Sequence, residues 1–294
     1  MSSELTLSEI PFNGSWKSLQ QSAAQMLPVA EGAMPEISVQ MKATQATRQK
    51  VELRISSKSF NQTPDVVLET LEIDLQAGEN NVVLPFKTSI LHTCYAFVCF
   101  MSNEYSSIRT SQTLITGLVS VFNKILPAVS NWGKQEPPED IGVEAFEFWC
   151  PERRPEGQNI AMKISPALKC FSKENLRQSP YRPIEKTNAW VADLGDKNPV
   201  ITISWEEEKT IEGITLFTDT DYDHAMESVQ WGHHDSRMPL CVEGIEIAGF
   251  EYTDNHQTAL KVHFQNPIRT KRLELKLKDN QSINPHSLFG IQLH

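Results

Sequence analysis

The sequence predicts a mainly β protein built from two β-sandwich domains. Apolar and polar residues alternate over many short segments, as between Ile37 and Met41, and this period of two is typical of a strand with one buried face. The Pro-rich polar segment ILPAVSNWGKQEPPEDI interrupts the pattern near the middle of the chain. No unit of roughly 20 to 50 residues repeats, which argues against a solenoid or a propeller. We therefore expect an N-terminal sandwich at 1–130, a linker at 131–142 and a second sandwich at 143–294.

One short helix is expected at the start of the first sandwich. Apolar residues recur at spacings near 3.6 between Trp16 and Met26, and the run stops before Pro28, where a helix would end. The helix is thus predicted as a leading element before the first strands.

From Glu36 onward the period changes to two. The alternation predicts strands at 37–41, 51–55 and 71–75. Ala77-Gly78 and the polar residues after it predict a hairpin turn that joins the last of these strands to Val82-Val83-Leu84. These strands are expected to be half-buried.

The densest apolar run, from Cys94 to Met101, predicts a strand covered on both faces. Cys94 and Cys99 are five positions apart, so their side chains would point to opposite faces and could not bridge each other. The chain has 5 cysteines at irregular spacing, which fits scattered buried thiols better than a disulfide framework or a zinc site. If the chain is complete as given, a reducing, cytoplasmic location is expected.

The charge balance narrows the class of partner. The 294 residues include 27 Lys and Arg against 37 Asp and Glu, a formal net charge of −10. Such an acidic chain is a poor binder of phosphate backbones, so no nucleic-acid partner is expected. No stretch approaches the roughly 20 apolar residues of a membrane helix, so no membrane span is expected either.

The second half also reads as a β-sandwich. After a long polar stretch that reaches about Asn188, the alternating pattern resumes and predicts separate strands at 201–205, 211–217, 241–247, 259–264 and 273–277.

The chain lacks the local signatures of nucleotide cradles, zincins and nucleophile elbows, and no catalytic residue is predicted. The densest polar candidate is Asp219, Asp221, Asp223 and His224. Alternating carboxylates followed by an imidazole could hold Ca²⁺, or a transition metal through mixed ligands. The match to an EF-hand loop fails at Ala225, where further oxygen ligands and a turn glycine are needed. A solvated loop, a metal site and a ligand-facing surface remain open interpretations.

A second candidate group is Tyr181, Arg182, Asn188 and Trp190. Aromatic rings offer flat apolar faces to sugar C–H groups, while Arg and Asn supply directional hydrogen bonds. The alternative is that Trp190 and Tyr181 fill the core and Arg182 pairs with a carboxylate.

Several of these segments also resemble a known family. The runs 187–193, 203–205, 212–224 and 238–242 resemble the C-terminal region of large bacterial FAD-dependent oxidoreductases, a discoidin-type, galactose-binding-like jelly roll. The runs 267–275 and 287–293 are similar to its last two strands. The resemblance covers 143–294 and, more loosely, the sandwich before it. The glycine-rich Rossmann turn of those enzymes is missing here, so no FAD is expected in this chain.

Three functions are compatible with these patterns. The first is a non-catalytic accessory protein whose jelly-roll loops bind a carbohydrate or a similar polar small molecule through Arg182, Asn188, Trp190, Asp219, Asp221, Asp223 and His224. The second is an interaction subunit, or the severed C-terminal part, of an FAD-dependent oxidoreductase. Exposure of Met226, Trp231 and Met238 would indicate such a protein interface. The third is a metal-assisted hydrolase that uses His224, His233 and His234.

Overall fold

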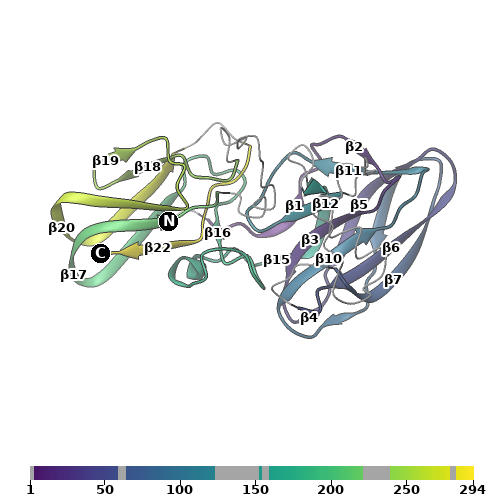
Figure 1. The fold of residues 1–294 in the computed structure, drawn as a ribbon, viewed down its shortest axis with the longest axis horizontal. Helices are drawn as coiled ribbons and strands as arrows, with labels where there is room; N and C mark the ends of the chain where they lie inside the picture. Colours follow the sequence, from purple (N-terminus) through teal and green to yellow (C-terminus); the bar gives the residue numbers. More distant parts are fainter. Residues whose placement is uncertain (1–2, 59–63, 123–151, 154–158, 221–238, 279–282) are drawn as a thin grey trace, which may run out of the picture.

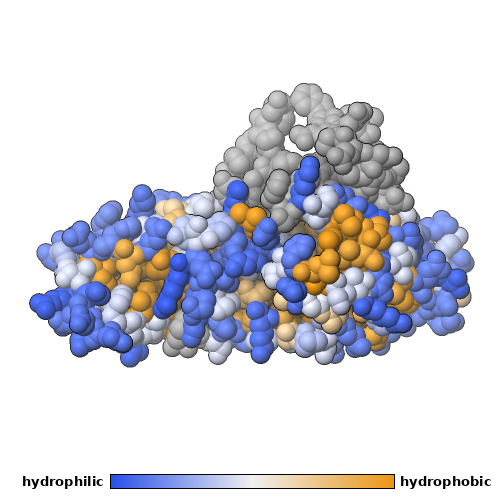
Figure 2. Space-filling model, turned by 90° about the horizontal axis from the view of Figure 1, so that it is seen from below, coloured by the Kyte–Doolittle hydropathy of each residue, from blue (hydrophilic) through white to orange (hydrophobic). Residues whose placement is uncertain are grey.

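The computed structural model describes residues 3–58, 64–122, 152–153, 159–220, 239–278 and 283–294. Apart from the short 3-10 helix Lys173–Arg177, the regular elements of this part of the chain are β-strands in antiparallel sheets. Two sandwiches lie side by side along the long axis of the molecule (Figure 1). On the face drawn in Figure 2 the surface is largely hydrophilic, with apolar patches on both sandwiches. The predicted mainly β fold class is therefore confirmed.

The N-terminal sandwich consists of two facing sheets. The first holds β1 (Leu7–Ile10), β15 (Met162–Leu168), β5 (Glu36–Ala43), β11 (Ser106–Ser111) and β14 (Asn159–Ile160), with β2 (Trp16–Ser18) on β11 and β8 (Gly78–Leu84) on β5. The second holds β13 (Glu152–Arg153), β12 (Val119–Phe122), β3 (Ala23–Val29), β10 (Cys94–Phe100), β6 (Thr47–Ile55) and β7 (Val66–Leu75). The short pair β4 (Gly32–Ala33) and β9 (Ser89–Ile90) lies apart from both.

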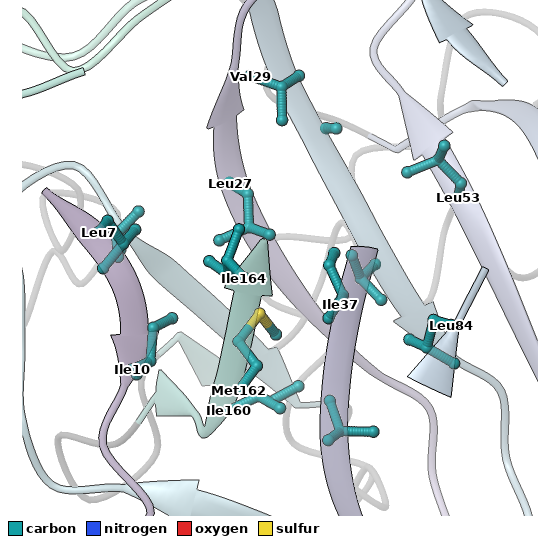
Figure 3. Packing of buried hydrophobic residues seen from close by; sticks show 14 of the residues in the cluster. Leu7, Ile10, Leu27, Val29, Ile37, Leu53, Leu84, Ile160, Met162 and Ile164 are labelled. Carbon is teal, nitrogen blue, oxygen red and sulfur yellow. The ribbon is translucent and has the colours of Figure 1, made fainter. Parts of the chain in front are cut away.

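The core of this sandwich forms where the alternating faces of the two sheets meet. Ile37 of β5 and Ile164 of β15 face Leu27 of β3 in one buried cluster (Figure 3). Each fully buried side chain of this size stabilises the fold by about 1.5–3 kcal/mol. The strand from Cys94 is buried along its whole length, as predicted. Its thiols at Cys94 and Cys99 belong to different buried clusters, which confirms that they point to opposite faces.

The predicted helix between Trp16 and Met26 is wrong, because this segment contains strands β2 and β3. All of β3 is buried, because β10 and β12 pair with its two edges and its two faces pack into different hydrophobic clusters. A strand covered on both faces shows no alternation, and its apolar run can imitate a helix. Its polar residue Gln25 is accommodated by hydrogen bonds: the Gln25 side chain donates to the Val119 carbonyl at 3.2 Å and accepts from the Ile160 amide at 2.9 Å.

The predicted hairpin at Gly78 is also wrong. Strand β7 pairs with β6 in one sheet, whereas β8 pairs with β5 in the other. Gly78 has φ +102°, a conformation that only glycine adopts without strain. The Asn80 side chain closes the bend, because it accepts from the Gln76 amide at 3.0 Å and donates to the Gln76 carbonyl at 2.9 Å. The turn therefore carries the chain from one layer to the other.

The N-terminal sheets include strands from beyond the expected linker. The segment 131–142 itself lies outside the described residues. The strands that follow it return to the first sandwich: β13 pairs with β12, β14 with β11, and β15 with both β1 and β5. Strand pairing thus assigns residues of 152–168, which were expected in the second domain, to the first one. The physical reason is that β15 fills the gap between β1 and β5.

The C-terminal sandwich is built mainly from one long ribbon. Its strands are β17 (Val200–Phe217), β20 (Ala259–Lys278), β18 (Gly244–Ile247), β19 (Phe250–Tyr252) and β22 (Gly290–Leu293), in the order β19-β18-β20-β17-β22. Segments expected as separate strands are continuous in β17 and β20. Their register shifts between Ser204 and Lys209 and between Ile211 and Gly213, and such bulges bend a ribbon. Apolar residues from both halves of the ribbon meet in one core.

The two sandwiches are joined by a small sheet of β16 (Trp190–Val191) and β21 (Ser287–Leu288). The hydroxyls of Ser287 and Thr116 lie 2.5 Å apart, and the Leu114 amide donates to Asn284 Oδ1 at 2.8 Å. The Leu5 amide donates to the Val191 carbonyl at 2.9 Å. These bonds connect residues that are far apart in sequence and fasten the sandwiches to each other.

Candidate functional site

One candidate region is a surface formed by Tyr181, Arg182, Phe217 and Gln292, called here the Tyr181 surface. The Tyr181 ring stacks on Phe217 with centroids 3.6 Å apart and planes 8° from parallel. The Tyr181 hydroxyl accepts a hydrogen bond from Gln292 Nε2 at 2.6 Å. Gly290 lies against the ring, and a Cβ at this position would overlap it. The missing side chain of Gly290 is therefore what lets Tyr181 lie flat over β17 and β22.

Asn188 fixes the loop that carries Arg182. Asn188 is buried and has φ +51°, in the left-handed region that Asn tolerates better than most residues. Its Nδ2 donates to the Arg182 carbonyl at 2.8 Å. Arg182 itself is exposed. Asn188 thus holds the backbone of Arg182, while the Arg182 side chain is exposed to solvent.

Trp190 is a core residue. Its exposed fraction is 0%, and it packs with Leu176, Ala192 and Leu288 in the C-terminal core. A ring with no accessible face cannot stack on a ligand in this structure. Of the two interpretations of Trp190, the structure therefore shows the second, a residue that fills the core. Trp190 Nε1 is buried without a hydrogen-bond partner, which indicates that packing holds the ring in place.

The acidic candidates are only partly described. Asp219 follows β17 and is 5% exposed. The residues Asp221, Asp223, His224, Met226, Trp231, His233, His234 and Met238 lie outside the described residues. Within the described ranges, no group of three or more His, Cys, Asp or Glu side chains comes together as a metal site would require. Thr218, next to Asp219, donates to the Gln257 carbonyl at 2.7 Å, so the end of β17 is anchored to the segment before β20.

The described cysteines are free thiols; Cys94, Cys99 and Cys241 are buried, and Cys170 is partly buried. Burial raises the pKa of Cys241 to about 11, and it raises the pKa of the fully buried Cys99 strongly. Asn255 lies against Cys241, with Nδ2 3.6 Å from the sulfur. A thiol acts as a nucleophile only as its thiolate. Both cysteines are therefore structural, as the sequence predicted for scattered buried thiols.

A buried ion pair lies on the outer face of β6 in the N-terminal sandwich. Arg54 Nε donates to Glu52 Oε2 at 2.7 Å, and Lys50 Nζ lies 2.6 Å from Glu52 Oε1. Arg54 also donates to the Pro64 carbonyl at 3.2 Å. Burial opposes the ionisation of Glu52, but hydrogen bonds and charges from Lys50 and Arg54 outweigh it and keep the pKa of Glu52 below its ordinary value. The pair fastens β6 to the segment before β7.

The other candidate region is a groove of about 480 Å³ on the outer face of the C-terminal sandwich. It is called here the β20 groove and is lined by Glu246, Ala248, Gly249, Ile268, Thr270, Arg272, Leu273, Glu274 and Lys276. Arg272 is paired with Glu274, and Lys276 Nζ lies 2.8 Å from Glu246 Oε1.

Sequence reasoning missed this groove. Along β20 the residues Arg272, Glu274 and Lys276 read as an ordinary solvated strand face. The groove arises because the bent ribbon and the turn at Ala248 enclose that face, and both are contacts between distant parts of the sequence. The only local signal was the alternation of charge sign along the strand.

No helix among the described residues is long and apolar enough to cross a membrane. No protein-family model matches the chain, and no curated protein sequence matches it either.

Solved structures give distant likenesses. The family 32 carbohydrate-binding module of Streptococcus pneumoniae EndoD is 12% identical with a TM-score of 0.27, over 40% of this chain and 88% of the module. A fucolectin from the serum of Morone saxatilis (striped bass) is 8% identical with a TM-score of 0.30, over 95% of this chain and 84% of the lectin. The CBM32-1 and CBM32-2 domains of Clostridium perfringens ZmpB, solved with GalNAc, are 13% identical with a TM-score of 0.22, over 90% of this chain and 78% of theirs. At these scores the likenesses carry no argument about this chain, and these three matches give no support to the resemblance to FAD-dependent oxidoreductases.

Proposed function

We propose that the protein is a non-catalytic binding module that holds a carbohydrate or a similar polar ligand at the Tyr181 surface. The observation that supports this is the flat Tyr181–Phe217 stack with an exposed arginine next to it on a fastened loop. Stacked rings present apolar surface that suits the C–H face of a sugar. The Arg182 guanidinium offers several N–H donors in a fixed plane, which suit neighbouring hydroxyls.

Rigidity of the surface is part of the proposal. Gln292 holds the Tyr181 hydroxyl and Asn188 holds the Arg182 backbone. A ligand that binds to a fixed surface spends less free energy on ordering side chains, so fewer contacts are needed for measurable affinity.

The test is a glycan array followed by titration calorimetry on the best-bound glycan. Arg182→Ala should weaken that binding about tenfold, which corresponds to roughly 1.4 kcal/mol for lost hydrogen bonds to a charged group. The matched control is Arg177→Ala, which removes another exposed arginine, at the end of the 3-10 helix, and should leave affinity unchanged. Absence of binding to every glycan, or equal affinity in the Arg182 variant, would refute the proposal.

A further inference from the structure

We propose that the β20 groove is a second binding site, which takes an uncharged, hydroxyl-rich ligand such as a segment of a neutral oligosaccharide. The groove shares no residue with the Tyr181 surface. This inference therefore stands or falls independently of the function proposed above.

The shape of the groove suits a small ligand. Its volume of about 480 Å³ falls within the range of about 300–1,000 Å³ that is typical of small-molecule sites. The turn at Ala248 and Gly249 lines it from one side, and the bent part of β20 at Ile268 and Thr270 also contributes. The partly exposed Ile268 lines the groove together with the charged groups, so the lining can contact both the C–H and the O–H groups of a sugar.

The charges of the lining argue for an uncharged ligand. Two carboxylates, Glu246 and Glu274, are matched by two cations, Arg272 and Lys276, so the formal charges cancel. An anionic ligand would meet the carboxylates, and a cationic ligand would meet the guanidinium and the ammonium group. A hydroxyl both donates and accepts, so it can hydrogen-bond to either sign.

The ion pairs hold these groups in place for such a ligand. Lys276 and Lys278 lie 2.8 and 3.1 Å from the two carboxylate oxygens of Glu246. Their hydrogen bonds lower the pKa of Glu246, so the carboxylate remains an acceptor at neutral and mildly acidic pH. Exposed ion pairs of this kind contribute little to folding. Their replacement should therefore leave a folded protein in which binding can be measured.

The turn at the groove has an unusual sequence for its conformation. Ala248 has φ +50° and Gly249 has φ +81°, and a two-residue hairpin with both central residues in this region normally prefers Asn followed by Gly. Alanine is strained here, whereas Asn would be favoured. The Ala248 methyl group is smaller than an Asn side chain, and this smaller group leaves room in the groove.

The experiment uses the full chain and a panel of neutral trisaccharides, together with their uronic-acid and amino-sugar counterparts. Binding is followed by calorimetry and mapped by NMR chemical shifts. A neutral trisaccharide should bind and shift the signals of 246–249 and 268–276. Arg272→Ala should weaken this binding about tenfold. The control is Arg269→Ala. Arg269 lies on the same strand, and its Nε is 2.8 Å from Glu208 Oε2, but it does not line the groove. Its replacement should therefore leave the affinity unchanged.

The substitution Ala248→Asn is a second test, in which binding should weaken although stability is not lost. It should keep or raise the melting temperature, because Asn suits the turn, and it should weaken binding about tenfold, because the larger side chain narrows the groove. The proposal is overturned if no neutral trisaccharide binds, if only charged members bind, or if both groove variants bind like the wild type. Binding that is lost in Arg182→Ala but kept in the groove variants would overturn this inference and leave the Tyr181 proposal standing.

Discussion

Trp190 and Val191 are neighbours on strand β16, yet their side chains pack into different hydrophobic cores. Trp190 belongs to the core of the C-terminal sandwich, and Val191 belongs to the core of the N-terminal one. Successive side chains of a strand point to opposite faces, and β16 lies where the two sandwiches meet (Figure 1). One two-residue strand therefore contributes to both cores.

Replacement of Trp190 by alanine should destabilise the protein by about 3–5 kcal/mol, because it removes a large, fully buried ring and leaves a cavity. Urea unfolding measures this change. Arg182→Ala is the control and should change the free energy of unfolding by less than about 0.5 kcal/mol, because its side chain is exposed. A loss below about 1 kcal/mol in the Trp190 variant would contradict its assignment to the core.

Glu52 should make the stability of the protein depend on pH. Its exposed fraction is 3%, and Glu52→Gln removes the carboxylate that Arg54 and Lys50 contact. We expect a loss of about 3 kcal/mol at pH 7, since a buried guanidinium then lacks its carboxylate.

The sign of the pH effect follows from the lowered pKa of Glu52. A group whose pKa is lower in the folded state stabilises the fold above its unfolded value, which is 4.5 here, and this stability is lost as the pH falls through the folded value. The difference between wild type and Glu52→Gln should therefore shrink as the pH falls below about 4.5. Urea titrations at several pH values test this, and a difference that is constant down to pH 3 would be incompatible with it.

The buried cysteines should resist alkylation in the native state. With a pKa of about 11, Cys241 is a thiolate at pH 8 in roughly one molecule in a thousand, and its burial blocks access as well. Iodoacetamide followed by peptide mass spectrometry should find Cys99 and Cys241 unlabelled in native protein and labelled in denaturant. Rapid native labelling of Cys241 would mean that its surroundings open easily.

Gly290→Ala should displace Tyr181 from Phe217, because the new Cβ would overlap the Tyr181 ring. The proposed glycan affinity of the Tyr181 surface should fall about tenfold, and the melting temperature should fall as well. In a Tyr181→Ala background the same substitution should cost little stability, because the ring is gone. A double-mutant cycle by thermal unfolding measures this coupling, and additive effects would show that the two residues do not interact.

The fold could be predicted from the sequence where one face of a strand is buried and the other is exposed to solvent. The alternation from Ile37 to Met41 corresponds to the buried and less buried positions of β5. The local pattern does not predict the structure where contacts between distant parts of the sequence determine it. Strand β3 is buried throughout, so its spacing of apolar residues imitates a helix. The turn at Gly78 has the local chemistry of a hairpin, but the pairing partners of β7 and β8 lie elsewhere in the sequence.

The candidate site could be predicted only in part. Tyr181, Arg182 and Asn188 lie in one loop, and the structure keeps them together. Trp190 has the right chemistry for a sugar-stacking residue, but the sequence does not say which neighbours cover it. Gly290 is informative only once it is known to lie under Tyr181, a contact between residues more than a hundred positions apart.

Because of strand β15, the two sandwiches cannot be separated by dividing the chain in the Pro-rich segment. This strand lies between β1 and β5 in the first sheet, although its residues, Met162–Leu168, follow the Pro-rich segment. A fragment that ended near residue 142 would leave β1 without this partner and would expose the edge of β5 at residues 36–39. Unpaired strand edges promote aggregation. Exchange of domains with other proteins, whether by recombination or by engineering, would have to keep residues as far as Leu168 with the N-terminal sandwich.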